Sequence, residues 1–124
     1  MDLVRHFRSA RNTVALPAGR ILFRSGDPGT VMYVLLEGSA AVLVGDDVVE
    51  IAGPGAVLGE MALLDEGPRS ASILARRDCT LVPIPREQFD LLIAETPAFA
   101  RQVMKSMADR LRRMNERRAL AHAA

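Results

Sequence analysis

The stretch "GEMALLDEGPRSA", residues 59–71, interrupts a long series of apolar segments with a short helical pattern. Gly59 permits a tight turn at its entrance, and "EMALL" is long enough for about one turn and a half of helix. The first amides of such a helix have no acceptors within it, and the helix dipole favours anions there. The stretch therefore predicts an anion site that uses the amides of Met61 and Ala62.

The second half of the same stretch adds charged and hydroxyl groups that suit a nucleotide. Arg69 follows Glu60 by nine residues, and Pro68 fixes the backbone in front of it. A planar guanidinium matches the oxygens of a phosphate, and Ser70 offers a further hydroxyl. The carboxylate of Glu60 accepts hydrogen bonds and so suits a sugar hydroxyl. A phosphate beside a sugar hydroxyl describes a nucleotide, and a compact one if the pocket lies inside a small β-barrel.

Short apolar segments separated by turn residues surround this stretch and predict a β-rich body over residues 12–85. Regularly spaced short strands of this kind are typical of a sandwich or barrel, and the residues around Gly45-Asp46-Asp47 predict a hairpin. The predicted strands are "TVAL", "RILF", "VMYVLLEG", "SAAVLV", "VVEIA", "SASILA" and "CTLVPI".

Helical patterns flank the β-rich body on both sides. The N-terminal residues 1–11 predict a short helix, and residues 86–95 predict another. Thr96 and Pro97 then suit the N-cap and first position of a final helix of about 20 residues, ending near 118. The tail "ALAHAA" is expected to fray. The apolar stripe of the final helix consists of Phe99, Val103, Met107, Leu111 and Met114.

The composition indicates one intracellular globular domain over residues 1–124. The 124 residues include 49% hydrophobic and 25% charged residues, and no apolar segment is long enough to span a membrane. The lone Cys79 excludes an internal disulfide and a thiolate metal site. Arg-rich and Ala-rich composition suggests a bacterial protein, and a cytoplasmic location is predicted. The seven basic residues between Arg101 and Arg118 are interpreted as a solvated helix face, so nucleic-acid binding is not predicted without an additional domain.

The pattern resembles the cyclic-nucleotide-binding domain family, which includes the sensor domains of catabolite-activator-type transcription factors, protein kinase A regulatory subunits and cyclic-nucleotide-gated channels. The family's phosphate-binding cassette reads roughly Gly-Glu-x-Ala, a variable stretch, then Pro-Arg-x-Ala. Turn and core positions upstream also match, although Leu58 stands where Phe is common. The matching residues are Gly59, Glu60, Ala62, Pro68, Arg69 and Ala71 in the cassette, with Gly26, Asp27, Tyr33 and Gly38 upstream.

The resemblance implies a mainly β fold with flanking helices, a β-roll or jelly-roll barrel with a short cassette helix and two C-terminal helices. It implies that Glu60 binds the ribose 2′-hydroxyl and Arg69 the cyclic phosphate. The predicted ligand-binding residues are Gly59, Glu60, Met61, Ala62, Arg69, Ser70 and Ala71.

The ligand is predicted to be cAMP, with cGMP as the alternative, and no other cofactor is predicted. The purine is expected to rest on Val42 or Ile73. The predicted polar readers of the base on the final helix are Arg101, Gln102, Lys105 and Ser106.

Ligand is predicted to shift the population of positions of the final helix, whose stripe either covers the pocket or joins a homodimer. The chain is either a stand-alone sensor or part of a longer protein, and its effector is not predicted. A protein-interaction module with a degenerate, non-binding cassette remains the alternative. An enzyme is not predicted, because His6 and His122 lie outside the strands and supply no metal-binding or catalytic cluster there. An iron–sulfur sensor is not predicted, because it needs several cysteines and Cys79 is alone. A haem sensor stays an open alternative in principle, although His6 is a poor axial candidate.

Overall fold

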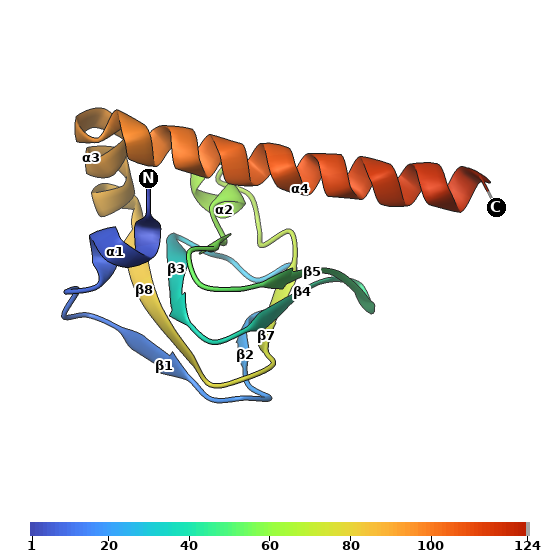
Figure 1. Ribbon diagram of the computed structural model, residues 1–124, viewed down its shortest axis with the longest axis horizontal. Helices are drawn as coiled ribbons and strands as arrows, with labels where there is room; N and C mark the ends of the chain where they lie inside the picture. The colour runs from blue at the N-terminus through green and yellow to red at the C-terminus, as the bar shows by residue number, and fades with distance from the viewer. Residues whose placement is uncertain (124) are drawn as a thin grey trace.

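The computed structural model describes the backbone of residues 1–123 and the side chains of residues 1–121. Its elements alternate much as the sequence predicts, with one helix, a series of strands interrupted by a short helix, and two final helices (Figure 1). In chain order these are α1 (Leu3–Phe7), β1 (Val14–Leu16), β2 (Ile21–Phe23), β3 (Val31–Glu37), β4 (Ala40–Val44), β5 (Asp47–Ala52), β6 (Val57–Leu58), α2 (Met61–Leu64), β7 (Ser72–Ala75), β8 (Cys79–Pro85), α3 (Arg86–Glu95) and α4 (Pro97–Ala123).

The eight strands form two four-stranded antiparallel sheets, with orders β1-β8-β3-β6 and β2-β7-β4-β5. This arrangement confirms the predicted β-roll, and the hairpin between β4 and β5 turns at Gly45, whose φ is +62°. The two-residue strand β6 was not predicted. Its residues Val57 and Leu58 are almost fully buried, and they pair with β3 immediately before the cassette.

Alternating side chains of β3 and β8 divide the core into two layers. Met32 and Val34 of β3 face the helices, where they pack in one cluster with Phe89 of α3 and Phe99 of α4. Leu35 faces the other way, into a second cluster to which both sheets contribute. A strand places successive side chains on opposite faces, so the β1-β8-β3-β6 sheet carries the helices on one side and closes the roll with the other.

The ends of the chain differ from the predicted boundaries. The predicted N-terminal helix over 1–11 spans only Leu3–Phe7, where Asp2 caps it by accepting from the amide of Arg5 (3.1 Å). The polar residues that follow favour turns over helix. The last helix is longer than predicted, because it continues through Ala123 instead of fraying after 118. Alanine and leucine in this tail are strong helix formers; residue 124 and the side chain of His122 lie outside the described part of the chain.

The apolar stripe of α4 is only half buried. Phe99 and Val103 lie in the core, whereas Leu111 and Met114 are 59% and 50% exposed. Leu111 and Met114 belong to neither core cluster. Figure 1 shows that the C-terminal end of α4 extends beyond the β-roll. Within the described helices, none combines the length and apolar character of a membrane span.

Candidate functional site

A cavity of about 550 Å³ lies between the cassette, the strands of the second sheet and the middle of α4. All seven residues predicted to bind ligand line it: Gly59, Glu60, Met61, Ala62, Arg69, Ser70 and Ala71. Val42 and Ile73, predicted as the wall for a purine, line it too. Its volume falls in the range of small-molecule sites. The structure therefore brings the predicted residues around one space.

Arg69 places a charged group in this cavity, and no carboxylate of the described residues pairs with it. The residue is 6% exposed. Its Nη1 donates to the carbonyl oxygen of Gly59 (3.1 Å), and its Nη2 donates to that of Val31 (2.7 Å). The guanidinium carbon lies 4.1 Å from the ring centroid of Phe23, a cation–π contact. Carbonyl dipoles and a ring face stabilise a cation less than a carboxylate does, so a bound anion would further stabilise this buried guanidinium.

Burial lowers the pKa of Arg69, and the nearby Tyr33 and Asp27 offset this effect only in part. An arginine stays protonated at neutral pH despite such a shift. Burial therefore disfavours the charged guanidinium, and an anion bound in the cavity would offset this effect.

The backbone of Arg69 is fixed by the turn between β2 and β3. The amide of Arg69 donates to the carbonyl of Asp27 (2.8 Å), and the amide of Gly26 donates back to the carbonyl of Arg69 (2.8 Å). Gly26 has a φ of +91°, which glycine adopts most readily. The resemblance placed Gly26 and Asp27 at a turn, and the structure shows that this turn holds the cassette arginine.

Two glycines leave the space that the guanidinium occupies. A Cβ on Gly59, whose φ is +80°, would lie 2.5 Å from Nη1 of Arg69. A Cβ on Gly29 would lie 2.1 Å from Nε and 2.3 Å from Cζ of the same side chain. The tight turn at Gly59 was predicted, whereas the role of Gly29 was missed. Its signal in the sequence, one more glycine in a turn, does not distinguish it from neighbouring turn glycines.

We expect Gly29→Ala to weaken ligand binding while leaving the fold intact. The φ of Gly29 lies outside the left-handed region, so alanine fits the backbone, and the new methyl group displaces only the end of a flexible side chain. Moving the guanidinium by an ångström or more should cost about 1–3 kcal/mol of binding free energy, because charge-assisted hydrogen bonds depend strongly on geometry. Calorimetric titration with cyclic nucleotides measures this loss of binding free energy. Gly53→Ala is the matched control, since no atom lies within 4 Å of its added Cβ; equal affinities of the two variants would contradict the prediction.

Glu60 is the second buried charged residue of the cavity. It is 1% exposed and immediately precedes helix α2. Its Oε1 accepts from Nη1 of Arg110 (2.5 Å), whereas its Oε2 has no hydrogen-bond partner among the described residues. The carbonyl of Glu60 accepts from the amides of Leu63 and Leu64. The carboxylate is therefore anchored through one oxygen and has an open acceptor at the other.

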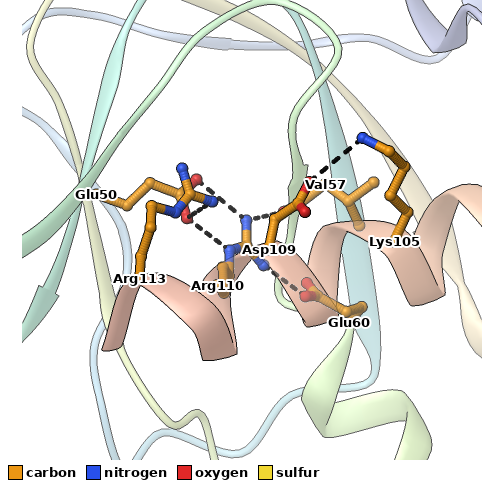
Figure 2. A network of polar contacts seen from close by, with 7 residues as sticks. All are labelled: Glu50, Val57, Glu60, Lys105, Asp109, Arg110 and Arg113. Atoms are coloured by element: carbon orange, nitrogen blue, oxygen red, sulfur yellow. Dashed lines mark hydrogen bonds and ion pairs between the residues drawn. The ribbon is translucent and has the colours of Figure 1, made fainter. Parts of the chain in front are cut away.

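The partner of Glu60, Arg110, comes from α4 and links three separate segments (Figure 2). Besides Glu60, it donates through Nε to Oε1 of Glu50 on β5 (2.8 Å) and through Nη2 to the carbonyl of Val57 on β6. Burial lowers the pKa of Arg110, but the charges of Glu60 and Glu50 more than offset this effect, so the pKa is raised. Arg113, one turn further along α4, also donates to Oε1 of Glu50 (3.3 Å).

The polar residues of α4 that line the cavity are not the ones predicted. None of Arg101, Gln102, Lys105 and Ser106 lines the cavity; Arg110 and Arg113 line it instead, together with Met107, Leu111 and Met114. Arg101 and Lys105 fall on the exposed side of the first turns of α4. The sequence offered no reason to prefer Arg110 over the other basic residues of this helix, because its two carboxylate partners are 50 and 60 residues away.

A family model matches the β-rich part of the chain that contains the cassette but does not extend to α4. The model described as "Cyclic nucleotide-binding domain" matches residues 13–96, which is more than half of the chain and includes the whole cassette. The chain belongs to the cyclic nucleotide-binding domain family. Among curated relatives, the domain is 38% identical over 101 residues to the cyclic AMP receptor protein of Thermus thermophilus, covering 77% of this chain and 47% of the relative.

Solved structures share the fold of this cyclic nucleotide-binding domain. The catabolite activator protein of Thermus thermophilus matches with a TM-score of 0.75 and 33% identity, over 90% of this chain and 55% of that one. A structure described as "cAMP bound PfPKA-R (141-441)" matches with a TM-score of 0.71 and 27% identity, over 85% of this chain and 36% of that one. The first curated relatives are longer, and the domain spans less than half of their length.

Within residues 1–121, no group of three or more His, Cys, Asp and Glu side chains is arranged to hold a metal ion. The two carboxylates nearest the cavity, Glu50 and Glu60, are separated by the Arg110 guanidinium that binds both. The charged and hydroxyl side chains that line the cavity offer hydrogen bonds and charge complementarity to a ligand.

Proposed function

We propose that this domain binds a cyclic nucleotide, cAMP in preference, with the phosphate at Arg69 and the ribose 2′-hydroxyl at Glu60. One observation carries the proposal. Among the described residues, the buried side-chain polar atoms without a hydrogen-bond partner are Oε2 of Glu60 and Nε of Arg69. Both residues line the same cavity, and one atom is an acceptor while the other is a donor. Buried polar groups are rarely left unpaired, so an acceptor and a donor that share one cavity support a ligand with a hydroxyl and an anion.

The electrostatics of the cavity support an anionic ligand at one end only. The charge of Glu60 is offset by Arg110 at 2.5 Å, whereas the charge of Arg69 is not offset by any carboxylate within ion-pair distance in the described part of the chain. A phosphodiester at Arg69 supplies that charge. Met61, Ala62 and Ser70 line the same cavity, and the amides at the start of α2 and the Ser70 hydroxyl are the further donors that we propose for the phosphate.

The proposed output is a change in the position of α4. Because Arg110 joins α4 to Oε1 of Glu60, a ligand at the open Oε2 would bind directly beside the contact that holds this helix. Such a ligand shifts the population of α4 positions to the extent that it binds one of them more tightly. The exposed Leu111 and Met114 of α4 then provide a surface for a second copy of the domain. We infer a regulatory domain without catalytic activity.

Isothermal titration calorimetry of the purified chain with cAMP and with cGMP tests this function. Saturable one-site binding of either nucleotide, together with an increase in melting temperature at ligand concentrations above Kd, is the expected result. Absence of heat and of stabilisation with both nucleotides would favour the alternative of a non-binding interaction module.

We expect Glu60→Gln to weaken cAMP binding by about 1–2 kcal/mol, roughly 5- to 30-fold, because a neutral amide oxygen accepts a weaker hydrogen bond than a carboxylate. The loss should be smaller with 2′-deoxy-cAMP, which lacks the hydroxyl. Calorimetry with both ligands separates the sugar contact from a general defect. Glu95→Gln on the exposed face of α3 is the control, and equal losses with both ligands would show that Glu60 does not bind the sugar.

A further inference from the structure

Only a few side chains around the cavity can form hydrogen bonds with the base of a nucleotide. In the described structure, the lining residues with charged or hydroxyl side chains are Glu50, Glu60, Arg69, Ser70, Arg110 and Arg113. The proposed function, on which this inference rests, assigns Glu60, Arg69 and Ser70 to the sugar and phosphate. Only the groups on β5 and α4 remain for the polar edge of a base.

Glu50 lies at the edge of the wall on which a purine would rest. In the sheet register, Glu50 is opposite Val42, and Val42 is opposite Ile73, and all three line the cavity. Directly opposite residues of antiparallel strands have Cβ atoms about 4.5–5.5 Å apart, so this row spans about the width of a purine. The β4–β5 register shifts by one residue directly after this pair, which makes Val49 an extra residue on β5. A planar base over Val42 and Ile73 therefore directs its edge toward the Glu50 carboxylate.

The two oxygens of Glu50 are not equivalent. Oε1 accepts from Arg110 Nε (2.8 Å) and Arg113 Nη2 (3.3 Å), which uses both of its lone pairs. Oε2 has only a long contact with Arg110 Nη2 at 3.5 Å. The Glu50 side chain is only 8% exposed, so water has little access to this oxygen. Figure 2 shows the arginine contacts of both oxygens. Because Glu50 lines the cavity and Oε2 has only this long contact, Oε2 can accept a further hydrogen bond there.

We propose that Glu50 selects adenine over guanine by accepting a hydrogen bond from the 6-amino group. Adenine offers one amino donor, which one open carboxylate oxygen matches, and a neighbouring ring nitrogen can accept from an arginine N–H. Guanine carries a carbonyl oxygen at the same place, which faces the carboxylate lone pairs and is repelled. Its two adjacent donors, N1–H and N2–H, require both oxygens of Glu50 and thus displacement of both arginines.

Competition between three ligands tests the assignment: cAMP, cGMP and the cyclic phosphate of purine riboside, which has hydrogen in place of the 6-amino group. The unmodified domain should bind cAMP roughly 5- to 150-fold more tightly than the 6-hydrogen analogue, the range of one base-edge contact. In Glu50→Met this ratio should fall to about one, and the cAMP-to-cGMP ratio should fall with it. Because loss of the Arg110 anchor affects all three ligands alike, the ratios report on the base.

Two further variants keep the result interpretable. Glu50→Gln retains the side-chain volume and one acceptor oxygen, so its cAMP-to-analogue affinity ratio should lie between those of the unmodified domain and Glu50→Met. If Glu50→Met does not give the native circular dichroism spectrum, the ratio of Glu50→Gln tests the role of Glu50. Asp47→Asn removes a negative charge from an exposed position of the same strand and should keep the original ratios.

The outcomes separate this inference from the proposed function. An unchanged cAMP-to-analogue ratio in both Glu50 variants, or a ratio near one in the unmodified domain, would overturn the role of Glu50 while leaving nucleotide binding intact. Failure of the unmodified domain to bind any of the three ligands would refute the proposed function itself, and the assignment of Glu50 with it.

Discussion

Arg69→Ala should weaken cyclic-nucleotide binding by about 2–5 kcal/mol, roughly 30- to several-thousand-fold. Among the described residues, Arg69 is the guanidinium of the cavity without a carboxylate partner, and its removal leaves the phosphate among the carbonyls of Gly59 and Val31. Those carbonyls repel an anion, so the loss exceeds that of a simple hydrogen bond. Calorimetry gives the affinity, and the nucleotide-induced rise in melting temperature should disappear at the same ligand concentration.

The stability of the ligand-free protein distinguishes this effect from unfolding. Arg69 is a buried cation without an ion-pair partner, so its removal relieves a desolvation cost while it leaves two carbonyls without donors. We therefore expect only a small change in melting temperature without ligand. Arg77→Ala, at an exposed position between β7 and β8, is the control and should retain full affinity. An Arg69→Ala protein with unchanged affinity would show that the phosphate does not bind there.

Gly38→Ala should lower the free energy of unfolding by about 2–5 kcal/mol, the largest stability effect expected for a single methyl group in this domain. Gly38 has a φ of +104°, which strains any residue with a Cβ. The added Cβ would lie 2.4 Å from the carbonyl oxygen of Asp78 and 2.9 Å from Cα of Cys79. These are backbone atoms of the neighbouring turn, so relief requires β3 and β8 to move apart.

Chemical denaturation monitored by circular dichroism measures this effect. Gly19→Ala isolates the cost of backbone conformation, because its φ is +85° and no atom lies within 4 Å of the added Cβ. That control should lose about 1–2 kcal/mol, the cost of a left-handed conformation for a residue with a side chain. Equal destabilisation of both variants would mean that the contact with the Asp78 turn contributes nothing.

Local sequence patterns determined most of the secondary structure and the chemical identity of the site. Residues 86–95 were predicted as a helix and form α3 with those bounds. All seven predicted binding residues line one cavity, because they belong to a continuous stretch whose turn, short helix and returning strand place them together. Hydrophobic periodicity, turn glycines and capping residues act over a few positions, so a single sequence records them directly.

Only the tertiary structure decided which distant residues complete the site. Gly29 leaves room for Arg69, which lies 40 residues further along the chain, and Glu50 and Glu60 share Arg110 of α4. In the sequence, Arg110 is one of seven basic residues between Arg101 and Arg118. Its distinction arises only when the fold brings Arg110 between Glu50 and Glu60 and largely buries these groups, because a shared guanidinium then satisfies two carboxylates. Residue propensities and hydrophobic periodicity do not predict such pairing between residues that are far apart in the sequence.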